Sequence, residues 1–224
     1  MSVLKTFRHE YKYVISYSEF LRLREKLNKV LDIDRNFNGY MIRSLYFDSV
    51  NDDDYYEKLN GELCRKKIRL RIYDSKGELI KLELKAKYDY HQLKESLIIT
   101  KEDAIELIEG KYSVLLKYKE ELASRIYTIL MTGYYKPKVI IEYNRIAYKS
   151  KTTTRITFDF EIKSSTNIKD FFKEKINYIE LIDKKDIVLE IKFDRFLEPY
   201  ISALLNKYVS RNQSVSKYMM GRNK

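Results

Sequence analysis

The sequence predicts an α+β fold, in which helices pack on one face of an antiparallel β-sheet of about eight strands. Several stretches alternate apolar and charged side chains, as strands with one buried face do. Other stretches repeat apolar residues at helical spacing. Only 6 glycines and 2 prolines occur among 224 residues, which disfavours a fold made largely of loops. No repeat or break in composition divides the chain, so residues 1–224 are expected to form a single domain.

The first predicted strand covers residues 7–16, FRHEYKYVIS. Tyr11 and Tyr13 share one face and Glu10 and Lys12 share the other, because successive side chains of a strand point to opposite sides.

A helix is predicted over residues 16–31. Ser16 and Glu19 have the spacing of a capping box, in which each side chain accepts a hydrogen bond from the backbone of the other residue. Apolar residues then recur at helical spacing, namely Phe20, Leu23, Leu27, Val30 and Leu31.

Four further strands are predicted at 40–49, 65–74, 78–88 and 92–100. The second of these contains KKIRLRIYD, in which cations on one face oppose apolar residues on the other. Lys76 and Gly77 separate it from the next strand and predict a hairpin.

Two helices follow in the prediction. The first covers 100–112, with Thr100 as its N-cap and Gly110 at its end. The second covers 114–133 and ends at Gly133, and it is the longest helix predicted.

In the C-terminal part, strands are predicted at 138–148, 154–162 and 187–194, followed by a helix near 199–208 and a polar tail. Glu142 and Arg145 differ in parity within the first of these strands, which predicts either a bulge or a strand with charges on both faces.

The composition favours an anionic partner. Lys and Arg number 44 against 33 Asp and Glu, a formal net charge of +11, which suits nucleic acid, a phosphorylated small molecule, a polyanion or an acidic membrane, unless it serves solubility alone. Cys64 is the only cysteine, and no signal peptide or membrane-spanning apolar run is found. We therefore expect a cytoplasmic protein.

Several chemistries are excluded by missing motifs. The phosphate-binding loop, the G-x-G-x-x-G loop and the G-x-S-x-G elbow are absent, and His9 and His91 are too few for a His-rich zinc site. The acidic run at 52–54 lacks the glycine and glutamate of an EF-hand and predicts a solvated turn or helix start.

The charged strand faces have two interpretations. An antiparallel sheet commonly has one wet face, so the cations can simply face solvent. If the sheet instead closes into a barrel, these faces turn inward and require water and a polyanion, because buried like charges are costly. Arginine would then bind phosphate oxygens in pairs, and the interspersed carboxylates would hold a divalent cation.

Eight short motifs occur in order: EYKYVIS, SLYFDS, IRLRIY, LELKAK, EYNRIAY, TRITFD, VLEIKF and SVSKYMMG. Together they resemble the VTC domain, the catalytic domain of the vacuolar transporter chaperone polyphosphate polymerase, which belongs to the triphosphate tunnel metalloenzymes and is related to the CYTH proteins. The resemblance spans residues 7–222. It implies an eight-stranded antiparallel β-barrel that forms a triphosphate tunnel, with helices packed outside.

The resemblance also implies site residues. The phosphate-binding positions are Lys12, Arg69, Arg71, Lys85, Lys94, Arg145, Arg155, Lys192, Ser216 and Lys217. Among them, the catalytic ones are Lys12, Arg69, Arg71 and Lys217. Glu190 is the implied metal ligand, with Glu10 and Glu83 as weaker candidates. Wider relatives begin with E-x-E-x-K, whereas Arg8 replaces the first glutamate here, as fits the VTC branch.

The implied activity is a polyphosphate polymerase that transfers the γ-phosphate of ATP to a growing inorganic polyphosphate chain with Mn²⁺ or Mg²⁺. Its partners are ATP and polyphosphate. No protein partner is required for the chemistry, a membrane partner in trans stays open, and no nucleic acid is expected. Two alternatives remain: a tripolyphosphatase or nucleoside triphosphatase of the same fold, and a non-enzymatic protein that binds RNA or polyphosphate.

Overall fold

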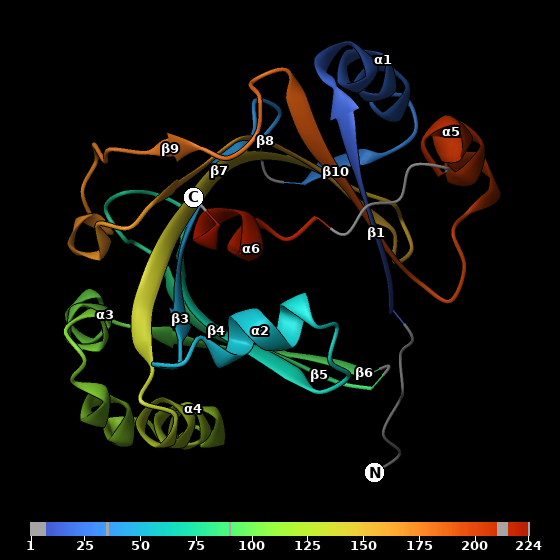
Figure 1. Ribbon diagram of the computed structural model, residues 1–224. Helices are drawn as coiled ribbons and strands as arrows, with labels where there is room; N and C mark the ends of the chain where they lie inside the picture. Colours follow the sequence, from blue (N-terminus) through green and yellow to red (C-terminus); the bar gives the residue numbers. More distant parts are fainter. Residues whose placement is uncertain (1–7, 35, 90, 210–214, 224) are drawn as a thin grey trace. The chain divides into compact units, whose positions relative to one another are not determined.

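The protein is an α+β chain with one antiparallel sheet of ten strands (Figure 1). This computed structural model describes residues 8–34, 36–89, 91–209 and 215–223. Eight strands form the main path in the order β1-β10-β8-β7-β3-β4-β5-β6, while β2 pairs with β7 and β9 with β8. The strands are β1 (Arg8–Ser16), β2 (Asp32–Asp34), β3 (Tyr40–Asp48), β4 (Arg65–Ile72), β5 (Ile80–Tyr88), β6 (His91–Ile99), β7 (Lys136–Lys149), β8 (Arg155–Ser165), β9 (Ile179–Glu180) and β10 (Asp186–Asp194).

The predicted fold class is confirmed, and every predicted strand is present. Position 7 of the first predicted strand lies outside the described residues. The helices are α1 (Tyr17–Leu27), α2 (Asp53–Leu59), α3 (Lys101–Ile108), η1 (Tyr112–Lys117), α4 (Glu121–Thr132), η2 (Ile168–Asp170), α5 (Pro199–Val209) and α6 (Lys217–Arg222). None of the helices in the described part of the chain is long and apolar enough to span a membrane.

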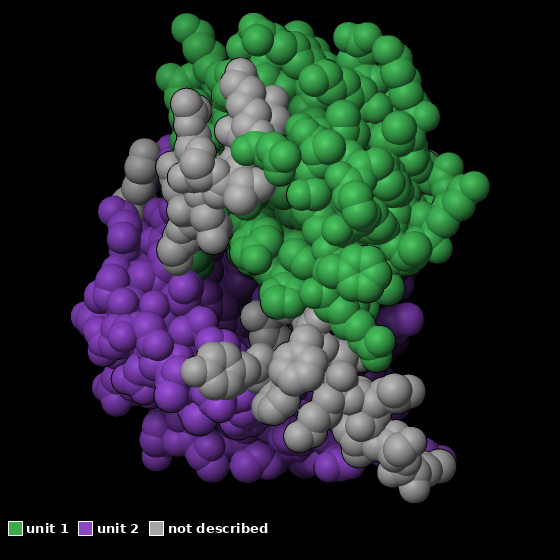
Figure 2. Space-filling view, turned by 90° about the vertical axis from the view of Figure 1, so that its right-hand side faces the viewer, with its two compact units in different colours: residues 1–41, 143–162, 182–216 green, residues 42–142, 163–181, 217–224 purple. Residues whose placement is uncertain are grey.

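The chain clusters into two compact units, which Figure 2 shows in different colours. Unit 1 contains residues 1–41, 143–162 and 182–216, and unit 2 contains residues 42–142, 163–181 and 217–224.

In unit 1, helices cover the apolar face of the strands. Tyr13 of β1, Leu189 of β10 and Phe158 of β8 belong to one hydrophobic core, which also contains Leu23 of α1 and Leu205 of α5. Because strand side chains alternate, Lys12 and Glu190 lie on the face that points away from this core.

In unit 2, α3, η1 and α4 cover the apolar face of β4 and β5, whereas α6 lies on the other side of the strands (Figure 1). The core includes Ile68 and Leu70 of β4 together with Leu82 of β5. Lys67 Nζ instead lies 4.9 Å from the ring centre of Tyr218 in α6. The two faces of β4 therefore have different neighbours, as the alternation predicts.

The capping box of α1 is confirmed, but the helix is shorter than predicted. Ser16 Oγ accepts from the Glu19 amide, and the Glu19 side chain accepts from the Ser16 amide at 2.9 Å. The helix ends at Leu27, because the chain turns there to place β2 against β7. Val30 is consequently exposed.

The long helix predicted over 114–133 is wrong, because the segment divides into η1 and α4. Lys117 and Tyr118 lie at the break, and both bind the Asp103 carboxylate of α3. These contacts with a separate helix hold Tyr118 in an extended conformation, with ψ 135°. Helical spacing of apolar residues does not reveal such a contact.

Two other segments differ in part from their prediction. The acidic run does begin a helix, α2, but Asp54 is buried there instead of solvated, and it accepts a hydrogen bond from Tyr135 at 2.6 Å. The described part of the polar tail forms α6, in which Tyr218 and Gly221 are buried. A Cβ at Gly221 would lie 2.3 Å from Ile141 Cδ1, so close packing of this helix depends on glycine.

Candidate functional site

Most of the predicted site residues gather into two charged clusters, one in each unit. The unit 1 cluster consists of Glu10, Lys12, Arg145, Asp159, Glu190 and Lys192. The unit 2 cluster consists of Arg69, Arg71, Glu83 and Lys94, with Ser44 and Tyr46 beside them. Both lie on the strand face opposite the hydrophobic core of their unit.

The antiparallel register of β1 and β10 builds the unit 1 cluster. Lys12 lies opposite Glu190, and Glu10 lies opposite Lys192, so each cation faces a carboxylate across the ladder. Lys12 Nζ is 2.7 Å from Glu10 Oε1 and 3.5 Å from Glu190 Oε1. Such cross-strand pairs stabilise the sheet while holding the charged heads in a defined order.

Glu190 is the centre of this cluster. Lys192 Nζ approaches its carboxylate to 3.3 Å and Arg145 Nη2 to 3.5 Å, in addition to Lys12. Burial would raise the pKa of Glu190, but Lys192 and Lys12 outweigh burial and hold the pKa well below its usual range. Burial would likewise lower the pKa of Lys12, but Glu190 and Glu10 raise it. Both groups are therefore charged at neutral pH.

Arg145 is held by Asp159, a residue that the sequence motifs did not single out. Its Nε and Nη2 donate to the two Asp159 oxygens at 2.6 and 2.7 Å, which is the bidentate geometry of a strong charge-assisted pair. Burial would lower the pKa of Arg145, but Asp159 raises it well above its usual value. Arg145 is thus permanently charged and fixed in direction.

The unit 1 cluster has a donor set that fits a divalent cation. Mg²⁺ is typically held by one or two carboxylates, with water and substrate phosphates completing its oxygen ligands. Glu10 and Glu190 supply two carboxylates that share the same lysine neighbours. No group of three or more His, Cys, Asp or Glu suited to a metal is found within the described ranges, so further oxygens would have to come from substrate and water.

The register of β3, β4, β5 and β6 builds the unit 2 cluster. One row across the strands reads Tyr46, Arg69, Glu83 and Ser96. The neighbouring row reads Lys67, Lys85 and Lys94. Lys85 thus lies at a register position between two other lysines.

Glu83 joins the cations of the unit 2 cluster. Arg69 Nε donates to Glu83 Oε2 at 2.7 Å, Lys94 Nζ lies 2.7 Å from Oε1, and Arg71 Nη1 lies 3.8 Å from Oε2. Only 1% of Glu83 is exposed. Burial would raise its pKa, but Arg69, Arg71 and Lys94 lower it to about 2. Three cations therefore share one ionised carboxylate. Its role as a weaker candidate for a metal ligand stays a prediction.

The arginines of this cluster are oriented by two further residues of β3. Arg71 Nε donates to Ser44 Oγ at 3.2 Å, and Arg69 Nη1 donates to the Tyr46 hydroxyl at 2.9 Å. Neither Ser44 nor Tyr46 was predicted. Both lie in SLYFDS, but the motif alone does not say which β4 residue lies opposite.

The remaining predicted residues are Arg155, Ser216 and Lys217. Arg155 starts β8 opposite Lys192, yet its Nη2 donates to Asp34 at 2.6 Å. Ser216 precedes α6, and Lys217 is the first residue of that helix.

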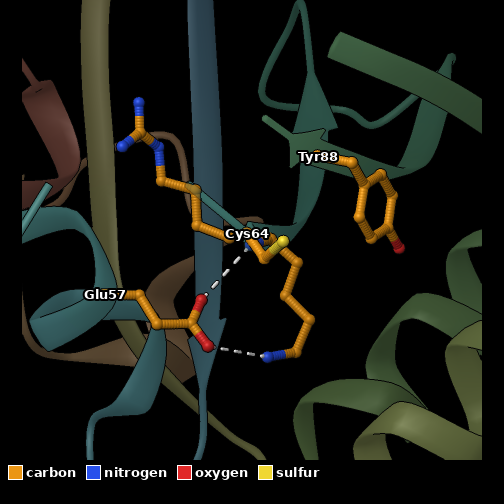
Figure 3. A pocket seen from close by; sticks show the side chains of 5 residues that line it. Glu57, Cys64 and Tyr88 are labelled. Carbon is orange, nitrogen blue, oxygen red and sulfur yellow. Dashed lines mark hydrogen bonds and ion pairs between the residues drawn. The ribbon is translucent and has the colours of Figure 1, made fainter. Parts of the chain in front are cut away.

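A separate shallow pocket of about 210 Å³ lies in unit 2 (Figure 3). It is lined by Glu57, Cys64, Arg65, Lys66 and Tyr88. Glu57 lies across from Lys66, with Oε1 3.4 Å from Nζ (Figure 3). None of these residues was predicted as a site residue, and the pocket holds no member of either cluster.

The fold has relatives among solved structures. A protein from Hippeastrum, described as a "putative adenylyl cyclase" with a dominant triphosphatase activity, matches with a TM-score of 0.59 and 14% identity, over 98% of this chain and 96% of that chain. A "putative adenylate cyclase" from Bacillus halodurans matches with a TM-score of 0.56 and 15% identity, over 94% and 95% of the two chains. A protein of the same description from Vibrio parahaemolyticus gives 0.54 and 13%, over 96% and 97%.

These matches show that the chain shares the fold of these proteins. No curated protein matches the sequence. The family model of the VTC domain, however, matches residues 7–224. This chain belongs to the VTC domain family.

Proposed function

We propose that this chain is a metal-dependent polyphosphate polymerase, which transfers the γ-phosphate of ATP to a growing inorganic polyphosphate chain. Membership of the VTC domain family supports a triphosphate substrate. The proposed partners are ATP and polyphosphate, with no protein partner needed for the chemistry and no nucleic acid. A cytoplasmic location stays a prediction from the sequence.

One observation carries the proposal: Arg69, Arg71 and Lys94 converge on the single carboxylate of Glu83. Cations held this close repel one another, and one carboxylate offsets only part of that repulsion. A chain of phosphates supplies several negative charges at short spacing, and the planar fork of arginine matches phosphate oxygens in pairs. The cluster is therefore suited to a polyphosphate.

Phosphoryl transfer depends chiefly on positioning and on stabilising charge, so no protein nucleophile is required. The arginines and lysines of the unit 2 cluster would neutralise charge on the substrate phosphates. In the unit 1 cluster, Lys12, Arg145 and Lys192 would do the same, since each is already held in direction by a carboxylate. The terminal oxygen of the acceptor polyphosphate would attack the γ-phosphorus of ATP, and the bond from that phosphorus to the β–γ bridging oxygen would break, so that ADP leaves and the acceptor is longer by one phosphate.

We assign the divalent cation to Glu190, with Glu10 as a second ligand. When bound, Mn²⁺ or Mg²⁺ would supply charge stabilisation and would orient the phosphate oxygens. Lys12 and Lys192 contact the same two carboxylates and would bind substrate phosphates beside them.

Triphosphate hydrolysis is the second candidate function. The Hippeastrum protein, whose fold is similar, is described as having a dominant triphosphatase activity. The same clusters would bind the triphosphate, and only the acceptor would differ, with water replacing the polyphosphate end. The nature of the product distinguishes the two functions.

To test the proposal, the purified chain is incubated with ATP and Mn²⁺ or Mg²⁺, and the products are separated on a polyphosphate gel while orthophosphate release is measured. Long polymer is expected, and EDTA is expected to abolish it. Orthophosphate without polymer would identify a triphosphatase. Binding of tripolyphosphate or RNA without any turnover would contradict both enzymatic functions.

Variants connect the product to the clusters. Arg69→Ala and Glu190→Gln are expected to lower the rate about 10²-fold or more, by analogy with the loss of one group that stabilises transition-state charge. Arg22→Ala and Glu25→Gln, which change exposed residues of α1, are the matched controls and should keep the wild-type rate. Circular dichroism checks that each variant is folded. Full activity in Arg69→Ala would exclude the unit 2 cluster from the chemistry.

A further inference from the structure

Tyr46 stands out among the side chains beside the predicted cations. It lies on β3 opposite Arg69, and only 7% of the residue is exposed. Its hydroxyl oxygen accepts a hydrogen bond from Arg69 Nη1 at 2.9 Å. The guanidinium carbon of Arg69 is also 5.7 Å from the Tyr46 ring centre, so the ring and the hydroxyl together fix this arginine.

The hydroxyl group of Tyr46 has one hydrogen bond to a described residue, in which its oxygen is the acceptor. A phenol can accept one hydrogen bond and donate another. The hydroxyl oxygen accepts from Arg69, because a guanidinium can only donate. Among the residues that the structure describes, no acceptor for the Tyr46 proton is found. The nearby tyrosine differs in this respect, since the Tyr218 hydroxyl donates to Asp48.

The groups that face Tyr46 are mostly cationic. Lys67, Arg69 and Arg71 approach from β4. From α6, the Tyr218 ring packs against Tyr46 at 5.1 Å between centres. Asp48, two residues along β3, is occupied by the Tyr218 hydroxyl and by backbone amides. A donor O–H placed among cations, with no acceptor of its own, is suited to an anionic ligand.

We infer that Tyr46 is a further substrate-contacting residue, whose hydroxyl donates a hydrogen bond to a phosphate oxygen that Arg69 also binds. This inference rests on the proposed function, because it requires a phosphate chain at the unit 2 cluster. The hydroxyl would thus act in two directions, accepting from Arg69 to orient it and donating to the substrate.

The same surroundings give the contact a pH dependence. Burial alone would raise the pKa of Tyr46, but Arg69, Arg71 and Lys67 lower it to about 8. Above that pH the hydroxyl becomes a phenolate, which cannot donate and which repels phosphate. The ratio kcat/KM reports groups of the free enzyme, so it should fall as the pH rises through 8.

The experiment compares the wild type with Tyr46→Phe, which removes the hydroxyl and keeps the ring. Binding of inorganic tripolyphosphate is measured by calorimetry, and kcat/KM is measured from pH 6.5 to 9.5. Tyr127→Phe removes a hydroxyl from α4, on the helical side of unit 2, and serves as the matched control. Thermal unfolding checks that each variant is folded.

The expected result is about 10- to 100-fold weaker tripolyphosphate binding by Tyr46→Phe, the usual effect of losing a hydrogen bond to a charged group. The fall in kcat/KM near pH 8 should disappear in this variant and remain in Tyr127→Phe. Equal affinity in Tyr46→Phe and wild type would overturn the inference and leave the proposed function intact. Weaker binding with an unchanged pH profile of kcat/KM would show that Tyr46 acts only through packing, and this result would overturn the inference as well. If the wild type does not bind tripolyphosphate, both the inference on Tyr46 and the proposed function are contradicted.

Discussion

At the scale of single residues, Glu83 is the carboxylate that three cations of the unit 2 cluster share. The carboxylate is buried and ionised, and it is the group that keeps Arg69, Arg71 and Lys94 together in the absence of substrate. Its loss should therefore matter most when no phosphate is bound.

Glu83→Gln keeps the shape of the side chain and removes its charge. We expect the free energy of unfolding to fall on the order of 3 kcal/mol, as when one partner of a buried ion pair is removed. Tripolyphosphate should restore part of this loss, since the anion replaces the missing charge. Urea unfolding with and without tripolyphosphate measures both effects. Glu25→Gln, in an exposed pair with Lys29, is the control and should change little. Unchanged stability in Glu83→Gln would contradict the shared-carboxylate interpretation.

Asp54 gives a pH dependence of stability. Burial raises its pKa to about 7, although Tyr135 and Lys66 act in the opposite direction. In the unfolded chain an aspartate has a pKa of about 3.9. The folded state therefore holds a proton that the unfolded state releases, and stability should fall as the pH rises from about 4 to about 7.

The measurement compares melting temperatures at pH 5 and pH 8 for the wild type, Asp54→Asn and Asp53→Asn. Asp54→Asn should lose much of the difference between the two pH values, because the asparagine does not titrate. Asp53 is an exposed neighbour in the same helix, so its variant should keep the wild-type difference. The same pH difference in Asp54→Asn would show that other groups cause it.

Residue types and motifs indicate some members of the clusters but not their partners. Lys12 and Glu190 stand out in the sequence because charged and apolar residues alternate around them. Asp159 and Tyr46 do not, since their importance comes from their hydrogen bonds with Arg145 and Arg69 on other strands. Only the register between strands reveals those pairs.

At the scale of elements, the start of α1 depends on Ser16. Its hydroxyl accepts from the Glu19 amide, which would otherwise have no partner in the first turn. Ser16→Ala should lower the free energy of unfolding by about 1 kcal/mol, the usual cost of losing an N-cap. Chemical denaturation measures the change, and Ser16→Thr should recover most of it by keeping a hydroxyl. Equal stability of the alanine variant and the wild type would argue against a role for the cap.

Element starts were easier to predict than element ends. The capping residues Ser16 and Thr100 act on amides three residues away, so the sequence contains the whole signal. The break between η1 and α4 depends instead on Asp103, a residue of another helix. The start of α6 likewise depends on the burial of Tyr218 against distant strands.

At the scale of the whole molecule, the net charge of +11 predicts stabilisation by polyanions. Inorganic tripolyphosphate at 100 times its dissociation constant should raise the free energy of unfolding by about 2.7 kcal/mol. Orthophosphate at the same total phosphorus should have a smaller effect, because separate ions do not span several cations. Melting temperature measured against ligand concentration tests this. Equal effects of the two ions would indicate unspecific screening.

The fold class was predictable because it depends on the alternation of charged and apolar side chains, and many residues contribute to that pattern. Each strand contributes its own pattern of charged and apolar side chains, so single errors at helix ends do not change the result. The order of the strands in the sheet does not follow from these patterns, since every strand with one apolar face satisfies them equally.

The strict alternation along β4 also bears on how this chain tolerates changes in length. Inserting or deleting one residue between Lys67 and Arg71 would turn every later side chain of the strand through to the other surface. The arginine side chains would then point into the hydrophobic core that contains Leu70 and residues of α4. Isoleucine side chains would take their place on the charged face of the strand. Changes of length in this part of the chain are therefore expected to survive only in connecting turns, such as the one between β4 and β5.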